Sequence, residues 1–489
     1  MLDGILFGLT LATLAVFVVR NRKIFLLCLV CAFILAAGDC LTQDILSKPI
    51  DYLTLVSLDS TMLAKAFTVI PQTLLVCGFV GVLGIWFFSR WHCLVHVKGK
   101  KFFPWGFVVF VLLANWQTYY YGTWEAYWEL AKSGVRVYSY KDCSFQDILQ
   151  KLNCQKKYVS LADAQCKVTN PQNLIVIYCE SFDKNFLNEK LFPYETAHLR
   201  DMVHSGYGLY GGYNAVEGST ATISALYATE TGLPTFFEAT DHNRIFMSLK
   251  NFLVPSYAGV LKKCGYKNVF LTNCEAEFGG TGALMKMLGY EEVAGAETYS
   301  YRTTNWGVHD CEVFATAKKK YLELTQGNRP FNITMLTVDT HFPKGLPDAD
   351  MRQYVDSHVE YPSHEYTVAT LDYLLWDFVQ WLKNQPGAEK TAVVILGDHN
   401  MMGSEESTKI KKKLHSIPEQ AVLLMSNRVL PGKQISSDLA FYDMPKIMLS
   451  LCGVTTDATF SKDLWPNLCA KDISDNKELF TVLNMKLTE

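Results

Sequence analysis

Four long apolar runs lie within the first 121 residues, and they constrain the fold more than any other feature of this chain. They cover residues 2–19, 24–38, 66–88 and 102–121. A helix needs about 20 apolar residues to cross a bilayer, and the first, third and fourth runs roughly meet that length. The second reaches it only when extended past Asp39. A buried soluble helix would explain any one run but not four in succession, so we predict a four-helix transmembrane anchor over residues 1–121.

Basic residues gather between the first and second runs and again between the third and fourth. They are Arg20, Arg22, Lys23, Arg90, Lys98, Lys100 and Lys101. Such clusters remain on the cytoplasmic side of a membrane. We therefore expect everything after Tyr121 to lie outside the cytoplasm, as the periplasmic part of a multi-pass protein of a bacterial inner membrane. The net charge of −3 offers no broad electrostatic footprint, so we expect no nucleic-acid partner.

The remaining chain divides into a juxtamembrane connector and a large domain. Residues 122–172 carry no alternating pattern and are interpreted as the connector. From residue 173 onward, strand-like apolar runs alternate with helical stretches. The strand-like runs cover residues 173–178, 268–272, 331–338, 391–396 and 420–425. This alternation predicts an α/β sheet with helices on both faces, so residues 173–489 are expected to form the extracytoplasmic catalytic domain.

Acidic and imidazole side chains follow two of these predicted strands. Glu180 comes after the run at 173–178, and Asp398 and His399 come after the run at 391–396. Open α/β sheets bind ligands beyond the carboxyl ends of their strands. Carboxylate oxygen combined with imidazole nitrogen suits zinc or manganese. A helix cap or a salt bridge would explain each residue singly, but together the three residues predict one divalent metal site.

A histidine and two hydroxyls complete the predicted site. His341 follows the strand-like run at 331–338 and is expected to contact a phosphoryl oxygen or to protonate a leaving group. Ser219 and Thr220 open an apparent helix, where unpaired N–H groups and the helix dipole suit a phosphoryl group. A metal could ionise either hydroxyl for nucleophilic attack. The alternative for Ser219 is ordinary N-capping of that helix.

Five motifs occur in an order that resembles a known family. They are Glu180-Ser-Phe, Gly218-Ser-Thr, Asn-Trp-Gly-Val-His-Asp at 305–310, Asp339-Thr-His-Phe-Pro and Gly397-Asp-His. The chain is similar to the sulfatase-type transferases of the alkaline phosphatase superfamily. The nearest resemblance is to the lipoteichoic acid synthases and the periplasmic glucan phosphoglycerol transferases. This resemblance implies an α/β catalytic domain of the sulfatase and alkaline phosphatase type.

The resemblance also implies a threonine nucleophile, a phospho-enzyme intermediate and one divalent metal, commonly manganese, with zinc and magnesium as alternatives. Carried onto this chain, Glu180, Asp398 and His399 match metal ligands and His341 matches the substrate histidine. The nucleophile, which would also contact the metal, falls on one of two hydroxyls. Counting back from the Gly-Leu-Pro at 232–234 selects Ser219, which we prefer, whereas counting from Gly218 selects Thr220.

Trp306 and His309 lie in a segment that lines the pocket in that family, so both are candidate substrate-binding residues. Simple core packing is the alternative for Trp306. The arginine that lipoteichoic acid synthases place near Phe278 is replaced here by Gly280 and Thr281.

The predicted reaction is transfer of a phosphoglycerol head group from phosphatidylglycerol in the membrane to an envelope glycan. The alternatives are a phosphoethanolamine transferase acting on a glycan or lipid A, and an inactive membrane scaffold. A sulfatase is disfavoured because the Cys/Ser-x-Pro-x-Arg signature is missing at residues 219–223.

Overall fold

The computed structural model describes most of the second part of the chain and selected segments of the first. The described residues are 8–13, 15–16, 19–46, 71–93, 128, 131–132, 138–140, 142–154, 157–210, 213–214, 216–236, 246, 253–299, 303–304, 306–342, 344–401, 409–416, 422–428 and 439–488. The chain forms two compact units. The first comprises residues 1–139 with 402–407, and the second comprises residues 140–401 with 408–489.

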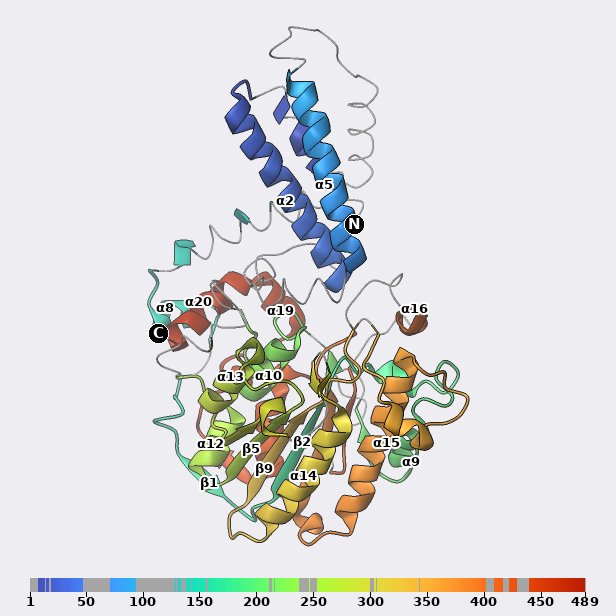
Figure 1. Ribbon diagram of the computed structural model, residues 1–489. Helices are drawn as coiled ribbons and strands as arrows, with labels where there is room; N and C mark the ends of the chain where they lie inside the picture. The colour runs from blue at the N-terminus through green and yellow to red at the C-terminus, as the bar shows by residue number, and fades with distance from the viewer. Residues whose placement is uncertain are drawn as a thin grey trace. The chain divides into compact units, whose positions relative to one another are not determined.

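The first unit contains two helices that pack against each other, α2 (Arg22–Leu46) and α5 (Pro71–His92) (Figure 1). The ring of His92 stacks on Phe25, with 4.1 Å between the ring centroids. Among the described residues, no helix combines the length and the apolar character needed to cross a bilayer. The four-helix anchor predicted for residues 1–121 stays a prediction. The first run is described only in short pieces, and the run at 102–121 lies outside the described residues.

A seven-stranded mixed sheet forms the centre of the second unit, in the order β3-β11-β10-β2-β9-β5-β6. Its strands are β2 (Asn173–Cys179), β3 (Gly208–Leu209), β5 (Lys267–Thr272), β6 (Glu292–Ala294), β9 (Phe331–Leu336), β10 (Thr391–Gly397) and β11 (Leu424–Ser426). Neighbouring strands from β10 to β6 run parallel, whereas β11 runs antiparallel to β10 and to β3. Strands β9 and β10 are buried along their whole length, as expected for central parallel strands with helices on both faces.

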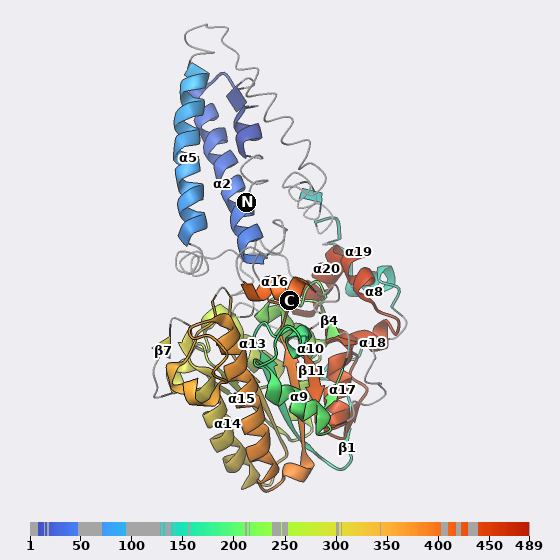
Figure 2. The ribbon, with the colours of Figure 1, turned by 90° about the vertical axis from the view of Figure 1, so that its right-hand side faces the viewer.

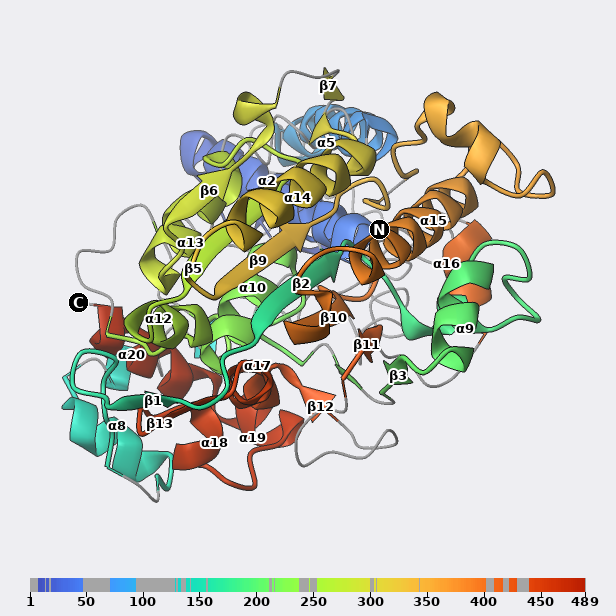
Figure 3. The same cartoon turned by 90° about the horizontal axis from the view of Figure 1, so that it is seen from below.

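Helices cover both faces of this sheet, as the alternating pattern predicts. Helices α14 (Asp310–Thr325) and α15 (His364–Lys383) lie on one side, with α9 (Ala197–His204) beside α15 (Figure 3). Helices α10 (Thr222–Thr231), α12 (Tyr257–Lys263) and α17 (Met444–Leu451) lie on the other side. The predicted α/β architecture is confirmed.

The C-terminal segment and residues 140–172 pack together on the second unit. Strand β1 (Cys166–Val168) pairs antiparallel with β13 (Val454–Thr456), and α8 (Phe145–Lys151) contacts α20 (Lys477–Thr488) (Figure 2). The Trp465 indole N–H donates to the Leu152 carbonyl over 2.6 Å. The second half of the segment interpreted as a connector thus belongs to this compact unit.

The remaining described elements are short. They are β4 (Tyr213–Asn214), α13 (Thr281–Leu288), β7 (Thr303–Thr304), β8 (Gly307–Val308), α16 (Lys409–His415), β12 (Leu439–Ala440), α18 (Ser461–Leu464) and α19 (Ala470–Asp475).

Candidate active site

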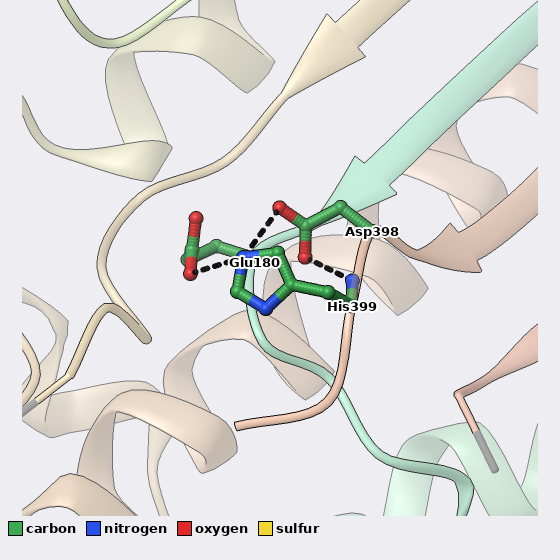
Figure 4. Close-up of side chains that lie close together, drawn as sticks. All are labelled: Glu180, Asp398 and His399. Atoms are coloured by element: carbon green, nitrogen blue, oxygen red, sulfur yellow. Dashed lines mark hydrogen bonds and ion pairs between the residues drawn. The ribbon is translucent and has the colours of Figure 1, made fainter. Parts of the chain in front are cut away.

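Two neighbouring parallel strands bring the predicted metal ligands together. Gly397 at the end of β10 pairs in register with Cys179 at the end of β2. The next residue in each chain segment is a carboxylate, so Glu180 and Asp398 emerge side by side at the same edge of the sheet, and Figure 4 shows both facing His399. Gly397 has no room for a side chain, because an added Cβ would collide with the backbone of Phe182.

The three side chains form a compact buried group. Nε2 of His399 lies 3.6 Å from Oε1 of Glu180 and 3.4 Å from Oδ2 of Asp398 (Figure 4). All three residues are at most 3% exposed, and one ligand atom from each lies within 4.8 Å of the others. They are the one group in the described part of the chain with the geometry to share a metal ion.

The hydrogen bonds of His399 and Asp398 leave a nitrogen lone pair and a carboxylate oxygen available to a cation. Nδ1 of His399 lies 2.8 Å from the Asn400 carbonyl, which only accepts, so the proton belongs on Nδ1 and the lone pair on Nε2. A histidine that donates one ring N–H to a backbone carbonyl and ligates through the other nitrogen is the usual arrangement in metal sites. Oδ2 of Asp398 is buried and has no hydrogen-bond donor, which leaves an anionic oxygen for an ion to satisfy.

The charges of the group depend on one another. Burial and the nearby charge of Glu180 raise the pKa of Asp398 to about 7. Burial also opposes ionisation of Glu180, but the imidazoles of His341 and His399 and the hydroxyls of Ser181 and Thr222 outweigh it and lower the pKa of Glu180. Two carboxylates crowded in a buried pocket are costly unless a positive charge joins them, and a divalent ion supplies that charge.

Besides the Ser181 hydroxyl, which donates to Oε1 of Glu180, the hydroxyl of Thr222 reaches this group. Its Oγ1 donates to Oε2 of Glu180 over 3.2 Å and lies 3.3 Å from Nε2 of His399. Thr222 is the first residue of α10, so the unpaired N–H groups of the first helical turn adjoin the same site. A phosphoryl group beside Thr222 would therefore meet backbone donors and the positive end of the helix dipole.

The two hydroxyls predicted from the sequence lie elsewhere. Ser219 is buried and donates from Oγ to the Val216 carbonyl over 2.7 Å. Thr220 is exposed, and the side-chain hydroxyls that bond to Glu180 among the described residues are those of Ser181 and Thr222. A tight turn at Gly218, with φ of +84°, delays the start of the helix, whose N-cap is Ala221. Thr222 was not predicted, because the helix was expected to begin at Ser219, three residues before its actual first residue. The hydroxyl residue Thr222 at the start of the sequence Thr-Ile-Ser-Ala was the signal that could have identified it.

The predicted substrate residues lie on the segment that follows β9 and on the segment before α14. His341 is half-buried, and its Nδ1 lies 2.6 Å from the Phe342 carbonyl. The Trp306 ring lies against His341 with 4.2 Å between centroids. His309 contacts Oδ1 of Asp339 through Nδ1 over 3.0 Å. These side chains connect to the ligand group through Thr340, whose Oγ1 donates to the Glu180 carbonyl over 2.6 Å.

Comparison with known proteins identifies the family of the second unit. Residues 172–446 match the family described as Sulfatase. Phosphoglycerol transferase I of Xanthomonas axonopodis is 26% identical over 290 residues, which are 57% of this chain and 40% of that protein. The chain thus matches less than half the length of that relative.

Two solved structures share the fold. The lipoteichoic acid synthase LtaP from Listeria monocytogenes has a TM-score of 0.50 at 17% identity and covers 69% of this chain and 81% of its own. The integral membrane lipooligosaccharide phosphoethanolamine transferase A from Neisseria meningitidis has a TM-score of 0.55 at 10% identity. The match covers 92% of this chain and 95% of that protein.

Proposed function

This chain belongs to the sulfatase family, and on that premise we propose that it transfers a phosphoglycerol head group from phosphatidylglycerol to a cell-envelope glycan. The observation that carries the proposal is the contact of the Thr222 hydroxyl with Glu180 and His399. The relatedness to phosphoglycerol transferase I supports the choice of head group.

Glu180, Asp398 and His399 would hold one divalent ion, with manganese as our first choice and zinc or magnesium as alternatives. When bound, such an ion lowers the pKa of a neighbouring hydroxyl and withdraws charge from phosphoryl oxygens. The carboxylates also position Thr222, since Oε2 of Glu180 accepts its hydroxyl hydrogen.

In the first half of the reaction, Oγ1 of Thr222 attacks the phosphorus of phosphatidylglycerol. A bond forms between that oxygen and phosphorus, and the bond to the diacylglycerol oxygen breaks. The departing oxygen takes up one proton, supplied by His341, and the hydroxyl of Thr222 loses its proton to solvent, so the charges balance. The ring of Trp306 packs against His341, with 4.2 Å between the ring centroids, and restricts its movement.

In the second half, a sugar hydroxyl attacks the phosphoglyceryl-Thr222 intermediate, and phosphoglycerol passes to the glycan. A lipid donor fits the proposed anchor at residues 1–121, with residues 173–489 on the periplasmic side of a bacterial inner membrane. The similarity over 92% of this chain to a structure described as an integral membrane protein supports that placement.

The test is release of labelled diacylglycerol from vesicles that contain fluorescent-tailed phosphatidylglycerol or phosphatidylethanolamine, with manganese present. We expect release from phosphatidylglycerol and its loss by roughly 1,000-fold or more in Thr222→Ala and Asp398→Ala. Ser219→Ala and Thr220→Ala serve as matched hydroxyl controls and should stay within a few-fold of the unmodified chain.

Other outcomes would change the proposal in defined ways. Release only from phosphatidylethanolamine would make the chain a phosphoethanolamine transferase. No release from either lipid by a folded, metal-loaded protein would favour the inactive scaffold.

A further inference from the structure

A second histidine and carboxylate pair lies beside the proposed pocket, outside the metal ligands. His309 is the N-cap residue of α14, yet its side chain makes no capping hydrogen bond. Instead, Nδ1 lies 3.0 Å from Oδ1 of Asp339, and the side chains are 16% and 2% exposed. A carboxylate only accepts, so Nδ1 carries a proton and Nε2 faces away from Asp339. Within the described residues, Nε2 has no hydrogen-bond partner.

Asp339 is held rigidly for this contact. Its second oxygen, Oδ2, accepts the backbone N–H of Asp310 over 3.0 Å. The Asp310 side chain in turn accepts from the backbone N–H of Val338 over 2.8 Å and from the Asn273 amide over 3.0 Å. Neighbouring backbone and side-chain donors thus fix both carboxylates before any substrate arrives.

The neighbouring carboxylates strengthen His309 as a base. Burial lowers its pKa, but the hydrogen bond to Asp339 and the charges of Asp339, Asp348 and Asp310 outweigh burial and raise that pKa. Burial raises the pKa of Asp310 well above its usual value, and the charge of Asp339 adds to the effect. Nε2 of His309 is therefore a stronger proton acceptor than an isolated imidazole.

The chain path connects this pair to the reaction site. Asp339, Thr340 and His341 are consecutive, and Thr340 donates to the carbonyl of the metal-ligand candidate Glu180. Trp306, which precedes His309 by three residues, contacts the ring of His341. Gly307 adopts φ of +128° between them and passes close to the Asn273 backbone, where a side chain would not fit. Contacts of Trp306 with His341 and of His309 with Asp339 thus hold the segment before α14 against residues 339–341.

We propose that His309, oriented by Asp339, is the base that activates the acceptor hydroxyl in the second half-reaction. This inference rests on the proposed transferase function of the site. The acceptor O–H gives its proton to Nε2 of His309 as its oxygen attacks phosphorus. The new oxygen–phosphorus bond forms, the bond to Oγ1 of Thr222 breaks, and Thr222 keeps the electron pair. Asp339 stabilises the imidazolium and is a positioning residue.

The test separates the two half-reactions by rapid quench, with phosphatidylglycerol vesicles, manganese and methyl β-glucoside as the acceptor probe. In His309→Gln we expect a diacylglycerol burst of about one per site, as in the unmodified chain. Steady turnover should fall about 100-fold or more, because a general base contributes that much, and the phosphoglyceryl protein should accumulate. Trifluoroethanol, a more acidic alcohol, should reduce the defect.

Asp339→Asn tests positioning through the pH profile of turnover. Loss of the negative charge on Asp339 should lower the pKa of His309, so turnover should fall and the acidic limb of the profile should move to lower pH. Asp310 and Asp348 remain as acidic neighbours of His309 in this variant. The control is His358→Gln, which removes the exposed pair of His358 and Asp356, whose 2.7 Å contact has the same chemistry away from the site. We expect no change in that variant.

Turnover within threefold of the unmodified chain in His309→Gln would overturn the assignment. Loss of the burst together with turnover would also overturn it, because the first half-reaction would then require His309. Failure of the unmodified chain to release diacylglycerol would instead overturn the proposed function, and this inference with it.

Discussion

The backbone N–H of Ser181 donates to Oδ1 of Asp398 over 2.8 Å, and the Ser181 hydroxyl donates to Oε1 of Glu180 over 2.6 Å. Ser181 makes both contacts from a left-handed backbone conformation with φ of +52°. That conformation costs a residue with a Cβ about 1–2 kcal/mol. The strain is thus located where one residue aligns two candidate metal ligands from neighbouring strands.

Replacing Ser181 should separate backbone strain from ligand alignment. Ser181→Ala keeps the strain and loses the hydroxyl, whereas Ser181→Gly removes both. We expect manganese affinity to fall about tenfold or more in each variant, because residues that orient metal ligands contribute that much. Without metal, Ser181→Gly should be more stable than Ser181→Ala by about 1 kcal/mol. Calorimetric titration and thermal unfolding measure the two effects, and unchanged affinity in both variants would contradict the alignment role.

Metal binding should stabilise the folded chain. The ligand group is preformed and buried, so an ion binds the native state and raises its unfolding free energy by about 2.7 kcal/mol at 100 times the dissociation constant. Chelation should lower Tm, and added manganese should restore it. Asp398→Ala should abolish the restoration.

Asp372→Asn is a matched control for this experiment. Asp372 is also a buried carboxylate, but it accepts from the backbone N–H groups of His198 and Leu199 at the start of α9. This variant should have a lower Tm without metal and keep the full increment with manganese. An equal increment in Asp398→Ala would place the ion elsewhere.

The sheet and the ligand group were predictable because their signals are local. Apolar runs such as residues 173–178 and 391–396 are too continuous for exposed strands, and adjacent parallel strands end at one edge of a sheet. Glu180, Asp398 and His399 follow those ends directly, so their meeting needs no knowledge of the loops.

Thr222 and the His309–Asp339 pair depend on backbone geometry that composition does not reveal. Ser219 has the residue type and position of a helix N-cap, but the turn at Gly218 directs its hydroxyl to Val216 and begins the helix at Thr222. Asp339 and His309 are 30 residues apart, and only the packing of α14 against β9 brings them together.

A buried glutamate predicts how stability depends on pH. Burial raises the pKa of Glu230 to about 8, although Tyr290 and Ala258 donate to its oxygens. Its ordinary pKa is about 4.5, so between pH 4.5 and 8 the folded chain holds a proton that the unfolded chain has lost. The stabilisation from this group is complete below pH 4.5 and declines by up to about 1.4 kcal/mol per pH unit as pH rises toward 8.

Urea denaturation of the unmodified chain and of Glu230→Gln at pH 5, 6, 7 and 8 measures this decline. The difference in unfolding free energy between the two proteins should shift in favour of the glutamine variant as pH rises, because glutamine cannot ionise. Asp372 and Asp183 titrate in both proteins and cancel from the difference. Parallel curves would show that Glu230 does not carry the pH dependence.

The position of the covalent intermediate on the chain identifies the nucleophile. The chain would be mixed with phosphatidylglycerol vesicles and manganese without a sugar acceptor, quenched in acid, digested and fragmented in a mass spectrometer. We expect one phosphoglyceryl group on Thr222, retained in Ser219→Ala and absent in Thr222→Ala. A phosphoglyceryl group on Ser219 or Thr220 instead would rule out Thr222 as the nucleophile.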